Sequence, residues 1–283
     1  MYKGGDFLEE KEYYSVGEVS KICNISKKAV RFYDKIGLIS PDKVCDDNNY
    51  RFYNRKTLLS VPIIKYYKQM GFKLEEMRSF LEGGTYPMLE KAFRQKLDNL
   101  KEMESEIFKM YTSVKDWYDL ILEAEMVIEN DVREVAIKYI DAINLIYLEQ
   151  DFNYNYMESI VSIDFTNYIE SINNEITGPV MISFPSFKDR MEGKSNKIRL
   201  MQKAILPCKE EEVLKFGGYM MVSCYHIGAH ENINETYKKI SDWAEAHGYT
   251  CAEESYERYV TDYWTTRNSD QFVTEILIKV TRE

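Results

Sequence analysis

Two sets of side chains in this 283-residue sequence have the types and spacing that binding chemistry needs. The first is basic: Lys27, Lys28 and Arg31 fall on one side of a short predicted helix, from which they can reach base edges or phosphates in a major groove. The second is acidic: Glu257 and Tyr259 share a face of a predicted strand, because side chains alternate along β-structure. A carboxylate between apolar strand positions is costly to bury without a partner or a function.

The basic set requires a helix-turn-helix, and residues 13–86 predict one. Ser15 and Ser26 have hydroxyls that can cap the starts of two successive helices. In the second helix, residues 27–36, we expect the lysines in solvent and Phe32 directed towards a small core.

A basic, aromatic hairpin strand is expected after that helix, at residues 50–53. Its side chains would contact the DNA backbone beside the groove, as would a lysine near the next helix start. A tyrosine at the end of the second helix has a hydroxyl that can meet a phosphate. The expected DNA contacts are Ser15, Lys27, Lys28, Arg31, Tyr33, Arg51, Tyr53 and Lys73.

The net charge divides the chain. Residues 13–85 carry 13 Lys and Arg against 8 Asp and Glu, whereas the whole chain has a net charge of −10. This sign change is typical of one DNA-binding face on a protein whose other surfaces are kept off DNA. No apolar run of about eighteen residues occurs, and the charged residues 1–12 have no signal-peptide core. We therefore expect a short N-terminal tail, no membrane partner and a cytoplasmic location.

Metal and redox chemistry have little support in the sequence. The five cysteines are scattered, and none forms a CxxC pair. Residues 125–135, at the end of a long predicted helix, contain neither Cys nor His. An iron–sulfur cluster needs clustered thiolates, so we expect no metal site and no cofactor.

One long helix is predicted for residues 87–130. Beyond Pro87 this stretch contains neither Gly nor Pro, and apolar residues recur at every third or fourth position. A helix of about forty residues extends near 60 Å, too long for the interior of a small domain. A coiled-coil dimer is the economical prediction, and an intramolecular helical hairpin is the alternative.

Residues 131–283 change to a mixed pattern. The order strand–helix–strand–strand occurs twice, first over residues 132–206 and again over 218–280. Two such units predict a pseudo-symmetric sheet with helices on one side. The predicted fold class is therefore α+β, with a winged helix-turn-helix, a long dimerisation helix and this repeated domain.

Four segments near the N-terminus share their order and spacing with a known family: residues 15–20, 29–39, 49–53 and 70–77. They resemble the MerR family of transcription regulators. The resemblance implies long helices that pair antiparallel in a homodimer, and two winged modules on a pseudo-palindromic promoter operator. It also implies that the activated dimer bends and untwists an overlong promoter spacer, so that RNA polymerase meets both promoter elements.

The C-terminal part resembles the effector-binding domain of gyrase-inhibitor-like proteins, most clearly from residue 217 onward. The similar segments are 217–219, 227–231, 243–249, 256–259 and 274–276. In the resembled domain, a glutamate at the position of Glu257 lies at the bottom of an aromatic-walled pocket for lipophilic cations. Each ring face adds cation–π attraction of about 0.5–2 kcal/mol. The candidate ligand-binding residues are Glu257, Tyr259, Tyr147, Phe184, Tyr219, Tyr225, Trp264 and, as a second acidic group, Glu134.

Both resemblances together point to the multidrug-sensing branch of the MerR family. The sequence therefore predicts a ligand-responsive transcription activator, not an enzyme, that senses a lipophilic, cationic aromatic small molecule. One alternative is a small-molecule hydrolase in which Glu257 polarises a water and Tyr259 acts as the acid. Another is a drug-sequestering protein, which leaves the DNA-binding module without a role.

Overall fold

The computed structural model describes residues 11–282, which form two compact units divided after Met103. Of the tail expected at residues 1–12, all but the last two residues lie outside the described part of the chain. The N-terminal unit is a winged helix-turn-helix. Its elements are β1 (Tyr14–Ser15), α1 (Val16–Ile22), α2 (Lys27–Lys35), β2 (Lys43–Val44), β3 (Arg51–Tyr53), α3 (Arg55–Gln69) and α4 (Leu74–Leu81).

The predicted helix starts in this unit are confirmed. Ser15 accepts a hydrogen bond from the backbone N–H of Glu18, whose carboxylate in turn accepts from the N–H of Ser15, which completes a capping box. The hydroxyl of Ser26 accepts from the N–H of Ala29 and caps α2. The expectation that Phe32 faces the core is wrong, since its side chain is 46% exposed. The residues of α2 that face the core are Val30 and Tyr33, which lie one turn apart.

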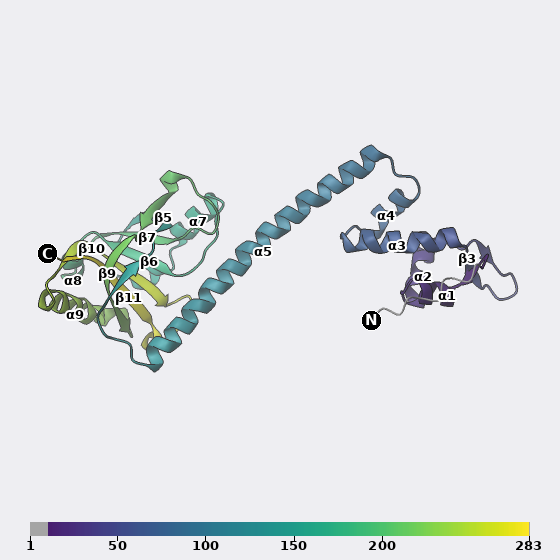
Figure 1. Cartoon of the computed structure of the whole chain (residues 1–283). Helices are drawn as coiled ribbons and strands as arrows, with labels where there is room; N and C mark the ends of the chain where they lie inside the picture. Colours follow the sequence, from purple (N-terminus) through teal and green to yellow (C-terminus); the bar gives the residue numbers. More distant parts are fainter. Residues whose placement is uncertain (1–10, 283) are drawn as a thin grey trace. The chain divides into compact units, whose positions relative to one another are not determined.

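The long helix α5 (Tyr86–Glu129) is uninterrupted over 44 residues, as the sequence predicts (Figure 1). In the N-terminal unit, Lys96 of α5 donates to the backbone oxygen of Gly71 at 2.5 Å. In the C-terminal unit, the last turns of α5 are buried against Val260 and Val273. Between these ends the helix exposes large apolar side chains, among them Leu97, Leu100, Met103, Ile107, Met110, Tyr111 and Val114.

The C-terminal unit is built on one antiparallel sheet in the order β4-β9-β11-β10-β6-β7-β5-β8. Its strands are β4 (Ala136–Ile140), β5 (Ile143–Asp151), β6 (Val180–Phe184), β7 (Lys197–Lys203), β8 (Val213–Phe216), β9 (Tyr219–Ile227), β10 (Tyr249–Thr261) and β11 (Val273–Arg282). Its helices are α6 (Tyr156–Ile160), α7 (Ile163–Ser171), α8 (Phe187–Met191) and α9 (Ile233–Ala246).

The predicted repeat is present, with a different first strand. The first unit runs β5, α6 with α7, β6, β7, and the second runs β9, α9, β10, β11. Residues 132–140 were expected to open the first unit, but β4 pairs with β9 at the edge of the sheet instead. The two repeats meet where β10 pairs with β6, which places Glu257 opposite Ile182 in the middle of the sheet.

The two faces of this sheet have different cores. On the face of Glu257, the helices α6, α7 and α9 cover a core that includes Ile182, Tyr259 and Ile276. On the face of the next residue, Arg258, the core contains Met181 and Leu277, and the end of α5 packs there. These are called the Glu257 face and the Arg258 face below.

Candidate functional site

The basic side chains of α2 lie where the sequence predicts, since Lys27, Lys28 and Arg31 are all exposed. On the hairpin, Arg51 is half-exposed and pairs with Asp34 of α2 at 2.6 Å. This ion pair joins the wing to the second helix of the helix-turn-helix. The arrangement offers a set of cations on neighbouring elements, which is the electrostatic basis of DNA binding.

Other expected DNA contacts have different surroundings. Lys73 is exposed at the start of α4, and Ser15 uses its hydroxyl in the capping box. The predicted contact between Tyr53 and the DNA backbone is wrong. Tyr53 is fully buried, so its side chain fills the core of the unit and cannot contact a phosphate. Burial, followed by the charge of Asp34, raises the pKa of Tyr53 to about 12. Tyr33 is also buried in this core.

In the C-terminal unit, the two carboxylate oxygens of Glu257 are fully engaged. One accepts from Arg190 Nε at 3.0 Å and from the hydroxyl of Tyr237 at 3.1 Å. The other accepts from the hydroxyl of Tyr259 at 2.6 Å. Glu257 is 0% exposed and lies among aromatic side chains, and the partner that its burial requires is Arg190 of the same chain. The hydrolytic alternative gains no support, because a general base must reach a water.

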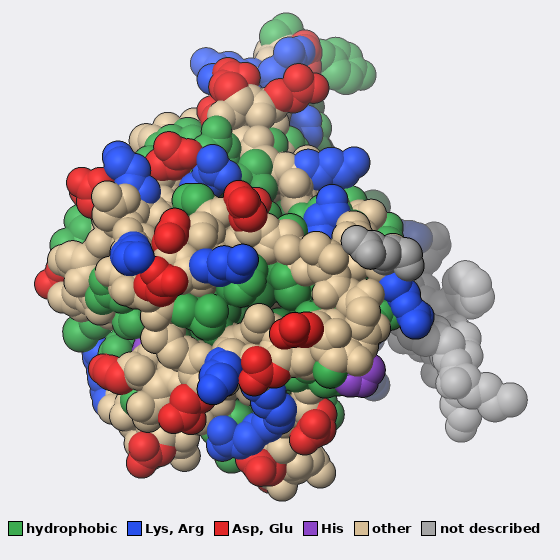
Figure 2. Space-filling model, turned by 90° about the vertical axis from the view of Figure 1, so that its left-hand side faces the viewer, with side chains coloured by type: hydrophobic (Ala, Val, Ile, Leu, Met, Phe, Trp, Pro, Cys, Tyr) green, Lys and Arg blue, Asp and Glu red, His purple; other side chains and the backbone are tan. Residues whose placement is uncertain are grey.

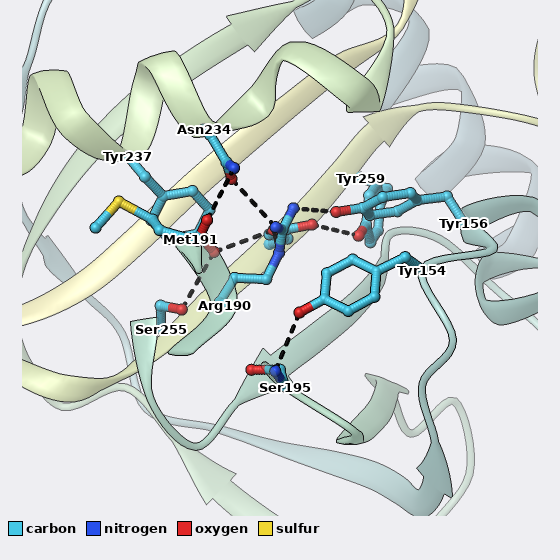
Figure 3. Close-up of polar contacts among 10 residues, drawn as sticks. Tyr154, Tyr156, Arg190, Met191, Ser195, Asn234, Tyr237, Ser255 and Tyr259 are labelled. Carbon is cyan, nitrogen blue, oxygen red and sulfur yellow. Dashed lines mark hydrogen bonds and ion pairs between the residues drawn. The ribbon is translucent and has the colours of Figure 1, made fainter. Parts of the chain in front are cut away.

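Arg190 is held like a bound cation (Figure 3). Its side chain is 3% exposed, and its terminal nitrogens donate to the hydroxyl of Tyr156 and, at 3.2 Å, to Asn234 Oδ1. Aromatic rings surround the guanidinium, with centroids 5.1–5.7 Å from its central carbon. The ring-bearing residues are Phe184, Tyr154, Tyr156 and Tyr237.

The short helix α8 positions this arginine. Ser186 caps its start by accepting from the N–H of Asp189, and Phe187 buries its first turn. The amide of Asn234 donates to the carbonyl oxygen of Met191 at 3.1 Å, which ties the end of α8 to α9. This short segment therefore carries the charge that neutralises Glu257.

Electrostatics keep the arginine charged. Burial opposes the charge, but Glu257 and the neighbouring tyrosine hydroxyls outweigh it and raise the pKa of Arg190 above its ordinary value. Burial, followed by the Glu257 carboxylate, raises the pKa of Tyr237 and Tyr259 well above the ordinary value. The phenols thus remain hydrogen-bond donors to the carboxylate at neutral pH.

Two polar side chains beside this cluster are left without partners in the described part of the chain. His230 is 2% exposed, and neither ring nitrogen has a hydrogen-bond partner there. Its ring stacks between Tyr156 and Phe272, with centroids 4.8 and 5.1 Å away. Burial lowers the pKa of His230 to about 3, so the ring is neutral at pH 7. The buried hydroxyl of Thr274, opposite Tyr259 in the sheet, is likewise unpaired.

Of the predicted ligand residues, the structure brings together Glu257, Tyr259 and Phe184. The others are corrections. Strand register places Tyr147, Tyr219 and Tyr225 on the Arg258 face. Trp264 follows β10 and packs its ring against Trp117 at 6.2 Å, and Glu134 is 93% exposed beside Lys239.

The Arg258 face carries a second arginine–glutamate cluster. Arg258 donates to both oxygens of Glu123 on α5, at 2.6 and 2.7 Å, and to Glu275 at 3.1 Å. Burial opposes the charge of Glu123, but Arg258 outweighs it, so the pKa of Glu123 lies below its ordinary value. A cavity of about 300 Å³ adjoins these charges, lined on its other side by Leu145 and Phe216 among other apolar residues.

The remaining surface of the C-terminal unit carries ordinary ion pairs. Figure 2 shows basic and acidic side chains interspersed over the face turned to the viewer, with apolar side chains between them. Arg199 with Glu149, at 2.9 Å, is one exposed example; such pairs contribute little to stability. Among the described residues, no group of three or more His, Cys, Asp and Glu can hold a metal ion, and no helix suits a membrane span.

Comparison with known proteins gives two family matches. Residues 14–83 match the MerR HTH family regulatory proteins, and residues 133–281 match the GyrI-like small molecule binding domain. The chain is similar to the multidrug-efflux transporter 1 regulator of Bacillus subtilis (strain 168), with 40% identity over 104 residues, 35% of this chain and 37% of that protein. The match thus spans little more than a third of that relative.

Two further similarities extend over nearly the whole chain. The multidrug-efflux transporter 2 regulator of Bacillus subtilis (strain 168) is 21% identical over 284 residues, covering 95% of this chain and 97% of that protein. The cryo-EM structure of an EcmrR–DNA complex aligns with a TM-score of 0.45 at 19% identity, covering 95% of this chain and all of that one.

Proposed function

Because this chain belongs to the GyrI-like small-molecule-binding family and carries a MerR helix-turn-helix, we propose that it is a ligand-responsive transcription activator. It binds a pseudo-palindromic promoter operator as a homodimer, and its effector is a cationic aromatic small molecule bound by the C-terminal unit. The observation that carries the effector class is the enclosure of a guanidinium by Glu257 and four aromatic rings.

The DNA-binding role rests on the exposed cations of α2 and the wing. Lys27, Lys28 and Arg31 are exposed side by side on the second helix, the element that enters the major groove in this motif. Arg31→Ala should weaken operator binding in a filter assay. Lys101→Ala, which removes an exposed charge from α5 instead, is the matched control. Equal affinities for Arg31→Ala and the wild type, at two salt concentrations, would show that the assigned face is wrong.

Dimerisation through α5 is supported by the apolar side chains that the isolated chain leaves exposed on this helix. An exposed apolar stripe of this length needs a partner surface. Leu97→Asp combined with Leu100→Asp should give monomers and abolish operator binding. Asn99→Asp with Lys101→Asp adds acidic groups to polar positions of the same turn and is the control. A monomeric wild-type protein in sedimentation experiments would contradict the dimer.

A route from effector to α5 exists within the C-terminal unit. Glu257 and Arg258 are consecutive on β10 and point to opposite faces, and Arg258 holds Glu123 of α5 through two hydrogen bonds. An effector that binds one arrangement of β10 more tightly than another will therefore also bias the attachment of α5. This supports a response to ligand in α5, the helix that continues from the C-terminal unit into the DNA-binding unit.

The experiment that tests the function measures operator binding and transcription with a matched pair of cationic and neutral aromatic compounds. The cationic compound should activate transcription, and Glu257→Gln should weaken its binding by about 1–3 kcal/mol, the scale of a lost charge-assisted contact. The neutral analogue should lose much less, and ligand-free operator binding should persist. Activation that is equal for both compounds, in both proteins, would remove the cationic effector from the proposal.

A further inference from the structure

We propose that Arg190 is a resident cation in the effector site, and that the effector is a planar N–H-bearing cation, of the amidinium or guanidinium class, that displaces it. This inference deepens the proposed function and rests on its assignment of the C-terminal unit as a small-molecule sensor. The sequence predicts an aromatic-walled pocket in which Glu257 binds the ligand's charge; in this inference a side chain of the protein already pairs with Glu257 and competes with the ligand.

The first argument is that the protein binds this guanidinium as it would bind a ligand. Glu257 supplies an anion at 3.0 Å, while Asn234 and Tyr156 accept from the other nitrogens. Aromatic rings supply the cation–π contacts. These are the components of a cation-recognition site, and the cation that fills it, Arg190, belongs to α8 and not to the sheet.

The second argument is that the occupant can leave. Helix α8 is only five residues long, and Lys188, Asp189 and Glu192 in and beside it are exposed. A buried ion pair gains little net stability, because desolvation of both charges offsets their attraction. If another cation keeps Glu257 paired, the guanidinium of Arg190 regains its hydration in water. Exchange of one cation for another therefore costs far less than opening the site empty.

The third argument concerns shape. The guanidinium donates to acceptors on three residues, while rings lie within cation–π distance of its central carbon. A tetrahedral quaternary ammonium has no N–H groups, so it would leave Asn234 Oδ1 without its donor and Glu257 with only the hydroxyls of Tyr237 and Tyr259 as donors. A planar amidinium or guanidinium head retains these bonds, and an attached aromatic body can use the ring surfaces.

The fourth argument is the pair of unsatisfied groups next to Tyr156 and Tyr259 of this cluster. The neutral ring of His230 stacks on Tyr156, and the hydroxyl of Thr274 lies on the strand position opposite Tyr259. Both are buried without partners among the described residues. Unsatisfied buried polar groups are rare and costly, so they mark the side on which polar atoms of a larger ligand can bind.

The test is chemical rescue in the full-length protein. Arg190→Ala should lower the melting temperature, and benzamidinium should restore it in a saturable manner. Benzamide, which is neutral and has nearly the same shape, should not. Benzamidinium should bind the wild type at least tenfold more weakly than it binds Arg190→Ala, because in the wild type it competes with the guanidinium of Arg190. Arg199→Ala, which removes an exposed arginine paired with Glu149, is the matched control and should not respond.

Two results would overturn the inference: no rescue of Arg190→Ala by benzamidinium, or the same rescue after Glu257→Gln is added. If Arg190→Ala does not fold, Arg190→Met fills more of the volume and is tested in the same way. The operator assay separates this inference from the proposed function. If another compound changes operator binding while benzamidinium fails to rescue, the sensor stands and the role of Arg190 falls.

Discussion

Two consecutive residues of β10 take part in arginine–glutamate clusters on opposite faces of one sheet, and their surroundings differ. On one face, Glu257 and Arg190 are sealed among rings, with 0% and 3% of their side chains exposed. On the other, Arg258 and Glu123 are each 22% exposed beside a cavity of about 300 Å³. The arginine–glutamate pair on the Glu257 face is therefore desolvated, whereas the pair on the Arg258 face is partly hydrated.

The difference teaches what each cluster can do. A sealed pair loses much when one partner is removed, because the other charge remains buried and uncompensated. Removing one partner of a partly hydrated pair costs less stability, because water solvates the charge that remains. The sealed cluster also includes an arginine on a five-residue helix, whereas the hydrated cluster joins α5 to two strands. We therefore expect exchange of partners on the Glu257 face and mechanical attachment on the Arg258 face.

The largest effect should come from removing one partner of the sealed pair. Glu257→Ala leaves the guanidinium of Arg190 buried without an anion, and we expect a loss of about 3–5 kcal/mol in the free energy of unfolding. Glu257→Leu combined with Arg190→Met should recover most of it, because no charge then remains buried. Denaturant unfolding of both variants measures this. A cost below about 1 kcal/mol for the single change would mean that the pair is hydrated.

The second effect is a pH dependence of the free energy of unfolding, which arises from His230 on the Glu257 face. His230 has a pKa of about 3 in the folded protein, below its ordinary value of 6.5, so the unfolded chain binds a proton more readily. Stability from this group is present above pH 6.5 and is lost as the pH falls towards 3. Between pH 7 and 5 the loss should be roughly 2 kcal/mol, and His230→Phe should remove it.

Asp262 acts in the opposite direction. Burial raises its pKa to about 7, so its contribution is present below its ordinary pKa of 3.8 and is lost as the pH rises through 7. Because Asp262 is unchanged in His230→Phe, the difference between the two stability profiles isolates the histidine. Parallel profiles from pH 7 to 5 would contradict a buried neutral imidazole.

A smaller loss is expected on the Arg258 face. Glu123→Gln keeps the shape of the side chain but removes its charge, which should cost about 1–2 kcal/mol. The cost should shrink as salt is added, since this cluster is partly exposed. Glu123→Gln should also weaken the coupling between effector and operator binding. A loss as large as that of Glu257→Ala would erase the distinction between the two faces.

The smallest effect should be at Thr274. Its hydroxyl is buried without a partner in the described part of the chain, and valine has nearly the same shape. Thr274→Val should therefore be neutral, or stabilising by less than about 1 kcal/mol, because no hydrogen bond is lost. Thermal unfolding measures it. A clear destabilisation would indicate that this hydroxyl has a partner in solution.

Local rules were sufficient for much of the fold. The hydroxyls of Ser15 and Ser26 marked two helix starts, and the absence of Gly and Pro after residue 87 marked α5. Alternation also placed Glu257 and Tyr259 on one face, where their side chains are hydrogen-bonded. Each of these features depends on neighbours within one element, which is the information that a sequence displays directly.

The errors came from relations between elements. Tyr53 is on a short hairpin, where composition does not say which side faces the core. Tyr147 and Tyr225 are aromatic and near the site in the sheet, but strand register turns them to the opposite face. Arg190 lies 67 positions from Glu257 on a helix that was not predicted. The only signal for it was the cost of burying a carboxylate without a cation.

The most direct test of the claim that a ligand displaces Arg190 from Glu257 is the NMR signal of the Arg190 side chain. In the free protein, its Nε–H donates to Glu257 in a buried site, so this proton should exchange slowly with water. When benzamidinium saturates the protein, the Nε–H signal should be lost to rapid exchange, as for an exposed arginine. A signal that stays protected at full saturation would show that the ligand binds elsewhere and that Arg190 is a fixed part of the core.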